Sequence, residues 1–260
     1  MTIAAGFIVS NGVLLCADSQ YTIGSSITYG NKVIVRELGG ARAVFAIAGH
    51  VDYGRMFTDF CGDLYEASDD KSVRALRAIT IGALSDFQTR YPVTATDDCQ
   101  VSFLIGLWAE GEKAQLFRAN RDALSVVDEW DCMGFAPALG KYLFGSIYER
   151  GLSLDSAAIL AAQVLADIKQ HDTYVGGPSN LVLLFNDGRM GRPNASELEI
   201  AENYRKQFLV VTHRLLEQLS NFATSDEFIL RSMHAYTDAF SRIRTEWRQD
   251  IEEHRRRLPR

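Results

Sequence analysis

Thr2 and three residues after it supply a nucleophile, a carboxylate, a positive charge and a backbone N–H donor. Asp18 and Gly49 each end an apolar run, and Lys32 is the only lysine before position 71. A threonine hydroxyl is a poor nucleophile unless a base lies within hydrogen-bond reach. An N-terminal threonine carries its own base, because its α-amine is close by and titrates at about 7.7–8.0. Removal of Met1 is therefore predicted to activate Thr2.

The chain around these residues reads as strands and helices in a regular order. Strands at 2–10 and 13–17 are predicted to be joined by a turn at Asn11-Gly12. Further strands are predicted at 32–35, 43–48, 100–108, 113–118, 123–127 and 181–185, and helices at 51–67, 71–89, 136–149 and 154–169. The predicted N-caps of the second and fourth helices are Ser68-Asp69-Asp70 and Ser153. This order predicts an α+β fold, a four-layer αββα sandwich with helices outside two stacked antiparallel sheets.

The order of short motifs resembles that of a catalytic proteasome β-subunit. The motifs are Thr2-Ile-Ala-Ala-Gly-Phe, Gly12-Val-Leu-Leu-Cys-Ala-Asp-Ser, Thr22-Ile-Gly24, Lys32-Val-Ile and Ile47-Ala-Gly49. A late segment, His171-Asp172-Thr-Tyr174-Val-Gly176-Gly177, resembles the family's Asp-x-x-Ser-Gly-Gly segment. The resemblance covers about residues 2–190. It implies an N-terminal-nucleophile (Ntn) hydrolase with the αββα fold, of the bacterial proteasome-homologue type.

Family positions give each catalytic residue an expected role. Lys32 would place positive charge beside Thr2 and favour loss of its protons. Asp18 would pair with Lys32 and keep it charged and oriented, with a surface salt bridge as the alternative interpretation. The backbone N–H of Gly49 would face the developing oxyanion, worth about 3–4 kcal/mol when well aimed. The adjacent His50 is interpreted as a helix-start residue rather than a catalytic one.

The resemblance also implies where a substrate would bind. Asp172 and Tyr174 would support the Thr2 amine indirectly, through the residues that contact it. Thr22 and the 47–49 strand would pair with the backbone of an extended peptide. The pocket before the cut bond would be lined by Tyr21, Ile47, Val51 and Arg55, which favours an apolar or aromatic side chain there.

The sequence departs from the family pattern at three positions. Val175 and, in the segment that aligns with a Gly-Ser-Gly turn, Phe135 replace serines that help to hold the terminal amine and its water. Gln20 replaces the usual arginine after Asp-Ser. These changes remove hydrogen bonds that tune the base, but they leave the nucleophile, lysine and aspartate in place.

Composition and charge are those of an ordinary globular protein. The 260 residues are 47% hydrophobic, and 27 basic and 33 acidic side chains give a net charge of −6. Nothing in this balance indicates nucleic-acid binding. No apolar run reaches the ~18 residues that a membrane helix needs, and no secretory signal is found. We therefore expect a cytoplasmic protein without nucleic-acid or membrane partners.

Cofactor and metal signals are missing from the sequence. Cys16, Cys61, Cys99 and Cys132 lack C-x-x-C spacing and are expected to be buried reduced thiols. The five histidines are too dispersed for a metal site, and no G-x-x-x-x-G-K-[ST] loop occurs. We predict no metal and no cofactor, and whether an ATP-dependent unfoldase feeds the protein is left open.

Residues 193–260 are predicted to form a C-terminal helical hairpin beyond the 2–192 Ntn-hydrolase domain. One apolar stripe runs from Leu198 to Phe222 and a second from Ile229 to Ile251, both with spacings of three and four residues. The resemblance does not reach this segment. Packing of the hairpin on its own domain and contact with another subunit are both compatible with the pattern.

Three functions remain after these arguments. The first is a threonine peptidase that self-assembles into a ring around its active sites and cleaves peptide or protein substrates. The second keeps the nucleophile in an Ntn amidase or transpeptidase that acts on a specific small amide. The third is a catalytically silent assembly protein, in which the two missing serines and the long helical tail would be explained without chemistry.

Overall fold

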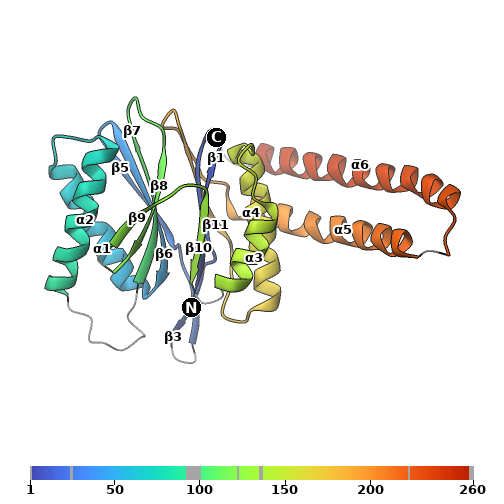
Figure 1. Ribbon diagram of the computed structural model, residues 1–260, viewed down its shortest axis with the longest axis horizontal. Helices are drawn as coiled ribbons and strands as arrows, with labels where there is room; N and C mark the ends of the chain where they lie inside the picture. Colours follow the sequence, from blue (N-terminus) through green and yellow to red (C-terminus); the bar gives the residue numbers. More distant parts are fainter. Residues whose placement is uncertain are drawn as a thin grey trace. The chain divides into compact units, whose positions relative to one another are not determined.

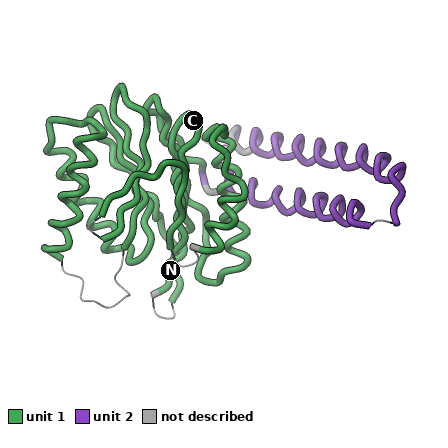
Figure 2. The backbone as a smooth tube through the Cα atoms, in the orientation of Figure 1, with its two compact units in different colours: residues 1–193 green, residues 194–260 purple. Residues whose placement is uncertain are grey.

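The computed structural model describes residues 2–23, 26–91, 101–121, 123–134, 137–221 and 223–257. The chain divides into two compact units, residues 1–193 and 194–260, shown in green and purple in Figure 2. The strands are β1 (Ile3–Val9), β2 (Gly12–Ala17), β3 (Gln20–Ile23), β4 (Ser26–Tyr29), β5 (Val33–Leu38), β6 (Ala41–Gly49), β7 (Val101–Ala109), β8 (Gln115–Asn120), β9 (Ala123–Val127), β10 (Trp130–Gly134), β11 (Asn180–Phe185) and β12 (Met190–Gly191). The helices are α1 (Val51–Ala67), α2 (Val73–Arg90), α3 (Pro137–Ile147), α4 (Leu154–His171), α5 (Ala195–Ser220) and α6 (Asp226–Arg257).

Unit 1 is a four-layer sandwich (Figure 1). The first sheet has the strand order β10-β1-β2-β11-β12 and the second the order β5-β6-β7-β8-β9, with antiparallel pairing throughout. Helices α3 and α4 contact the first sheet, and α1 and α2 contact the second. The two sheets meet through β1 and β2 on one side and β6, β7 and β8 on the other. The predicted αββα fold is therefore confirmed.

The turn between β1 and β2 differs in detail from the predicted one. Val9 pairs with Gly12, so the two turn residues are Ser10 and Asn11 rather than Asn11 and Gly12. Gly12 opens β2, and a Cβ atom placed on it would lie 2.2 Å from the Leu184 carbonyl oxygen of β11. The glycine is therefore required by the close approach of a neighbouring strand rather than by the turn.

Other differences concern short elements. The sequence pattern predicts no strand for β3, β4, β10 or β12, each of which has only two to five residues. The N-cap of α2 is Ser72, whose side chain accepts from the Ala75 N–H, rather than a residue at 68–70. Ser153 caps α4 as predicted, and His50 is the N-cap of α1. The parts of the predictions that fall on Gly24, Cys99, Gln100, Phe135, Ala136 and Phe222 lie outside the described residues.

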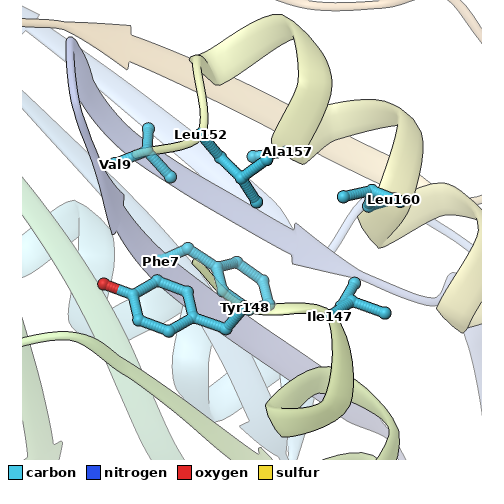
Figure 3. A pocket seen from close by; sticks show the side chains of 7 residues that line it. All are labelled: Phe7, Val9, Ile147, Tyr148, Leu152, Ala157 and Leu160. Atoms are coloured by element: carbon cyan, nitrogen blue, oxygen red, sulfur yellow. The ribbon is translucent and has the colours of Figure 1, made fainter. Parts of the chain in front are cut away.

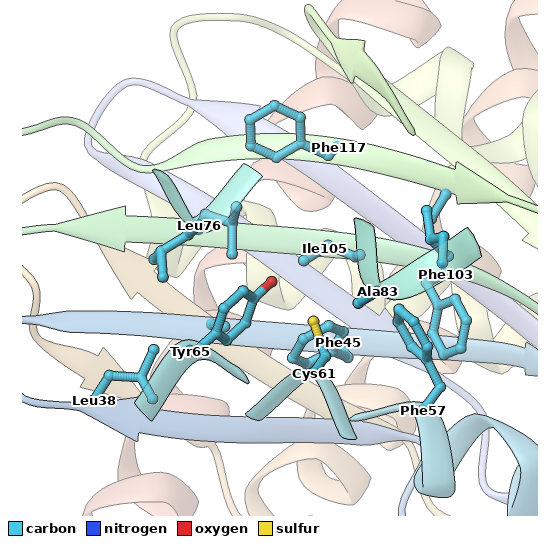
Figure 4. Packing of buried hydrophobic residues seen from close by; sticks show 14 of the residues in the cluster. Leu38, Phe45, Phe57, Cys61, Tyr65, Leu76, Ala83, Phe103, Ile105 and Phe117 are labelled. Atoms are coloured by element: carbon cyan, nitrogen blue, oxygen red, sulfur yellow. The ribbon is translucent and has the colours of Figure 1, made fainter. Parts of the chain in front are cut away.

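A large buried cluster lies between the second sheet and its two helices (Figure 4). Phe57 of α1 packs against Phe45 and Phe103, with ring centroids 6.4 and 4.7 Å away. The Tyr65 hydroxyl lies 2.5 Å from Thr80 Oγ1, and that oxygen in turn donates to the Leu76 carbonyl. Tyr65 must therefore donate to Thr80, which satisfies a polar group that the core encloses.

The three buried thiols are expected to be unreactive in the folded protein. Burial raises the pKa of Cys61 and Cys132 to about 12 and that of Cys16 beyond this range. Since a thiol in the unfolded chain ionises near 9, the stability tied to these groups is complete below pH 9 and is lost as pH rises above it. We expect no reaction of these three thiols with a disulfide reagent at pH 8 in the folded protein, and complete reaction in guanidinium.

The control for this experiment uses the fourth cysteine. A Cys99→Ser variant removes the residue that lies outside the described ranges, so any remaining signal comes from the buried three. Urea unfolding of this variant should require less urea at pH 10 than at pH 8. Rapid labelling of the folded variant would contradict the burial of these thiols.

Unit 2 is an antiparallel helical hairpin. Tyr204 stacks on Trp247 and Phe208 on Phe240, with centroids 6.1 and 5.9 Å apart. The Tyr204 hydroxyl also donates to Asp250 at 2.7 Å. The two helices therefore pack on each other. None of the helices in the described ranges is long and apolar enough to cross a membrane.

Candidate active site

The carboxylate of Asp18 lies at the centre of the predicted site, directly after β2. It is fully buried, and Oδ1 accepts from the Ile3 N–H at 3.0 Å and from Lys32 Nζ at 2.7 Å. Its other oxygen, Oδ2, accepts from the N–H groups of Gln20 at 3.0 Å and Gly176 at 3.3 Å. These bonds compensate the loss of water around a buried charge. The Asp18–Lys32 pair is buried on both sides, which excludes the surface salt bridge.

Lys32 is held by backbone contacts as well as by its partner. Its Nζ donates to the Gln20 carbonyl at 2.5 Å, in addition to Asp18. Its N–H donates to Asn180 Oδ1 at 3.1 Å, and its carbonyl accepts from the Ile47 N–H at 2.9 Å. Burial lowers the pKa of Lys32 to about 8, although the charge and hydrogen bond of Asp18 oppose this shift. The Lys32 ammonium group therefore loses its proton more readily than that of an exposed lysine.

The backbone around Thr2 is held by Asp18 and closely approached by Gly134. The following residue, Ile3, donates to Asp18 Oδ1, and its carbonyl accepts from the Asp18 N–H at 3.2 Å. Gly134 of β10 has a φ of +122°, and a Cβ atom there would lie 1.9 Å from the Thr2 carbonyl oxygen. Thr2 itself is only 2% exposed. Its hydroxyl oxygen is buried and has no hydrogen-bond partner among the described residues.

The late Gly-Gly segment closes against the end of β2. The Gly176 carbonyl accepts from the N–H groups of Ser19 and Gln20 at 3.2 and 3.0 Å. Gln20, at the position of the family's arginine, donates from Nε2 to the Thr173 carbonyl at 2.9 Å. Val175, at one missing serine, is buried. Phe135, at the other, lies outside the described residues.

Asp172 and Tyr174 lie in the same segment as Gly176. Asp172 is the C-cap of α4, and its Oδ1 accepts from the Tyr174 N–H at 2.8 Å. The Tyr174 side chain is exposed. The carboxylate of Asp172 therefore shapes the turn, and support of the Thr2 amine by these two residues stays a prediction.

Of the residues predicted to bind substrate, Tyr21 and Arg55 meet. The Tyr21 hydroxyl donates to the Asn31 carbonyl at 3.0 Å, and Arg55 Nη2 donates to the same oxygen at 3.3 Å. Val51 is half-buried at the start of α1. Ile47 is fully buried in the core cluster against α1, so its side chain faces protein.

Gly49 lies at the turn between β6 and α1. Gly49 is exposed at the end of β6 and has a φ of +107°, a conformation that residues with a Cβ rarely adopt. His50 Nδ1 then accepts from the Tyr53 N–H at 3.3 Å to start α1. The Thr22 hydroxyl is buried and has no hydrogen-bond partner in the part of the chain that the structure describes. Binding roles for Thr22 and Gly49 stay predictions.

A small cavity lies elsewhere, between β1 and the helices α3 and α4 (Figure 3). Its volume is about 10 Å³, enough for roughly one water molecule. Its lining is apolar apart from the Tyr148 hydroxyl, which donates to the Ile8 carbonyl. This cavity is a packing defect rather than a substrate site. No group of three His, Cys, Asp or Glu side chains in the described ranges could hold a metal ion.

Comparisons with other proteins agree on the fold. The model of the proteasome subunit family matches residues 2–184. Anbu from Hyphomicrobium sp. strain MC1, in a mutant form, superposes with a TM-score of 0.70 at 18% identity over 84% of this chain and 100% of that one. Anbu, described as an ancestral beta-subunit, from Yersinia bercovieri gives 0.69 at 14% identity over 82% and 97%. A helical assembly of the Anbu complex from Pseudomonas aeruginosa gives 0.70 at 16% identity over 83% and 96%. No curated protein matches the sequence.

Proposed function

Because the chain belongs to the proteasome subunit family, we propose that it is a threonine-type peptidase whose nucleophile is Thr2 after removal of Met1. One observation carries the proposal. The Thr2 hydroxyl is buried without a hydrogen-bond partner among the described residues. The next N–H along the chain donates to the same Asp18 oxygen that holds the Lys32 ammonium group. Asp18 thus links the start of β1, which carries Thr2, to the Lys32 ammonium group. An uncommitted hydroxyl supports a role as nucleophile once the α-amine is available as its base.

The reaction begins when Thr2 Oγ1 forms a bond to the carbonyl carbon of a peptide. The hydroxyl proton passes to the α-amine of Thr2, directly or through a water, and the nearby positive charge of Lys32 favours its loss. The carbonyl oxygen becomes an oxyanion that the Gly49 N–H stabilises. The carbon–nitrogen bond then breaks, and the leaving amine takes the proton. Attack by water on the resulting ester releases the acid and restores Thr2.

The substrate in this proposal is an extended peptide. Its backbone would pair with Thr22 and with the end of β6. There β6 continues past Ala46, the partner of Val33 at the start of β5, to Gly49, which pairs with Val101 of β7 on the other side of the strand. Tyr21, Val51 and Arg55 would surround the side chain before the cut bond. Ile47 would shape that pocket from behind, because its side chain is buried.

Self-assembly completes the proposal. A similar solved structure is described as a helical assembly of the Anbu complex, and we propose that this chain likewise encloses its active sites in a ring or helix of copies. The α5–α6 hairpin forms the C-terminal unit of residues 194–260. In this proposal the hairpin contributes contacts between copies.

Buried Val175 favours the two alternative functions in one respect. An apolar side chain at this position cannot hold the terminal amine or its water by a hydrogen bond. A specific Ntn amidase would turn over a small amide without cleaving a peptide library. A catalytically silent assembly protein would do neither.

The experiment that tests the proposal is the intact mass of the purified protein before and after treatment with a peptide epoxyketone or β-lactone. We expect loss of one methionine and then one adduct per chain, because these reagents react with a free N-terminal threonine. The same reagent should give no adduct with protein unfolded in urea. A mass that retains Met1, with no adduct, would favour the assembly protein.

A further inference from the structure

Tyr21 lies across the ammonium group of Lys32. The centre of its ring is 4.8 Å from Lys32 Nζ, within the range of a cation–π contact. The ring is anchored at its far end, because its hydroxyl donates to the Asn31 carbonyl. Arg55 donates to the same carbonyl from α1. The ring is therefore held in place by the residue that precedes Lys32 in the chain.

Gly30 provides the space for this arrangement. A Cβ atom on Gly30 would lie 2.8 Å from Tyr21 Cε2 and 3.4 Å from Arg55 Nη2. A side chain at this position would push the ring away from where it now lies. The contact between Tyr21 and Lys32 thus depends on Gly30. Among the described residues, the hydrogen bonds of Lys32 Nζ go to Asp18 and to the Gln20 carbonyl, and Gly30 is not one of these partners.

We propose that Tyr21 is a positioning residue for Lys32. The face of the Tyr21 ring stabilises the ammonium form of Lys32 beside Asp18 and keeps that group in place for catalysis at Thr2. The consequence for hydrolysis rests on the proposed function. The contact between ring and ammonium group does not, and it is measurable by itself.

The effect matters because of where Lys32 titrates. Burial lowers its pKa to about 8, with Asp18 from the end of β2 opposing this shift. Burial raises the pKa of Tyr21 in β3 to about 12; Arg55 of α1 opposes this shift, and the charges of Asp18 and Asp52 add to it. A desolvated cation–π contact corresponds to about one pKa unit. At pH 7.5 a fall from 8 to 7 would reduce the charged fraction of Lys32 from about three quarters to about one quarter.

The experiment is a titration of lysine labelled with 13C at Cε, followed by NMR on the full-length protein. The chain has only six lysines, at positions 32, 71, 113, 141, 169 and 206, so Lys→Arg variants at the other five assign the Lys32 signal. We compare Tyr21→Phe, which keeps the ring face, with Tyr21→Leu, which keeps apolar bulk without it. The expected result is a Lys32 pKa within about 0.3 unit of wild type for phenylalanine and lower by about one unit for leucine.

A pair of glycine variants tests the same contact without changing either partner. Gly30→Ala should lower the Lys32 pKa, as Tyr21→Leu does. Gly39→Ala is the matched control, because a Cβ atom there meets nothing within 4 Å, and it should leave the pKa unchanged. Equal pKa values in Tyr21→Phe and Tyr21→Leu, or a rise in Tyr21→Leu through entry of water, would overturn the proposal.

The pH dependence of Thr2 acylation by a β-lactone separates this inference from the proposed function. If both are correct, the pH profile of the leucine variant moves with its Lys32 pKa, and phenylalanine restores the wild-type profile. If no variant is acylated but the NMR shifts occur as expected, the peptidase proposal fails and the role of Tyr21 stands. If Thr2 is acylated but the Lys32 pKa is the same in all variants, the nucleophile stands and the role of Tyr21 fails.

Discussion

Replacing Thr2 with alanine should abolish peptide hydrolysis and adduct formation while leaving the fold and the oligomeric state intact. Loss of the nucleophile removes the covalent step, for which a fall of roughly 10³-fold or more is typical of hydrolases that depend on one. Stability should change little, because the Thr2 hydroxyl makes no hydrogen bond with the described residues. The measurements are turnover of a fluorogenic peptide library, size-exclusion chromatography and thermal unfolding.

Two control variants sharpen this experiment. Thr2→Ser keeps a hydroxyl and should retain measurable turnover. Ser19→Ala removes another buried hydroxyl that has no partner among the described residues, next to Asp18, and should leave turnover near the wild-type rate. Hydrolysis that survives in Thr2→Ala would show that the nucleophile lies elsewhere, and equal loss in Ser19→Ala would point to local disruption.

Asp18→Asn should be the most destabilising single change at the site. The amide keeps the shape of the carboxylate, but it leaves a buried ammonium group without its counter-charge and turns an N–H donor towards other donors. Gln20 and Gly176 donate to Oδ2, and Ile3 and Lys32 donate to Oδ1, so either orientation of the amide loses bonds. Removal of one partner of a buried ion pair costs about 3–5 kcal/mol. Urea unfolding followed by fluorescence measures this cost.

The pH dependence of this variant has a definite sign. Asp18 raises the pKa of Lys32 against burial, so its loss moves that pKa further below about 8. The unfolded lysine holds its proton until about 10.5, and therefore the variant gains stability as pH rises through its lowered pKa. The wild-type protein does not gain stability in this way until the pH approaches its higher Lys32 pKa of about 8. The difference in unfolding free energy between the two proteins should thus narrow between pH 6 and pH 8.

An exposed ion pair provides the control for the same chemical change. Asp59→Asn removes the partner of Arg36, where the aspartate side chain is 67% exposed. Solvent screens such pairs, and the expected cost is below about 1 kcal/mol. Equal losses in Asp18→Asn and Asp59→Asn would contradict the view that burial makes the Asp18–Lys32 pair critical.

The sequence by itself determined the elements whose signals lie within a few neighbouring residues. Apolar residues at spacings of three and four placed α1 at 51–67, where the structure has it. Ser153 was identifiable as the cap of α4 because its hydroxyl accepts from an N–H three residues away. Asp18 and Lys32 could be selected as a pair because both lie beside apolar strands, at positions that resemble those of the proteasome subunit family.

Tertiary structure decided everything that depends on distant partners. The short strand β10 has no clear pattern of its own and exists because it pairs with β1, more than 100 residues earlier. The N–H of Gly176 reaches Asp18 across 158 residues of sequence. Packing between elements likewise buries Ile47 and places the ring of Tyr21 over Lys32. It also leaves the Thr2 hydroxyl without a hydrogen-bond partner among the described residues. Spacing along a chain encodes which elements form, but only their packing determines which side chains lose water and which groups they meet.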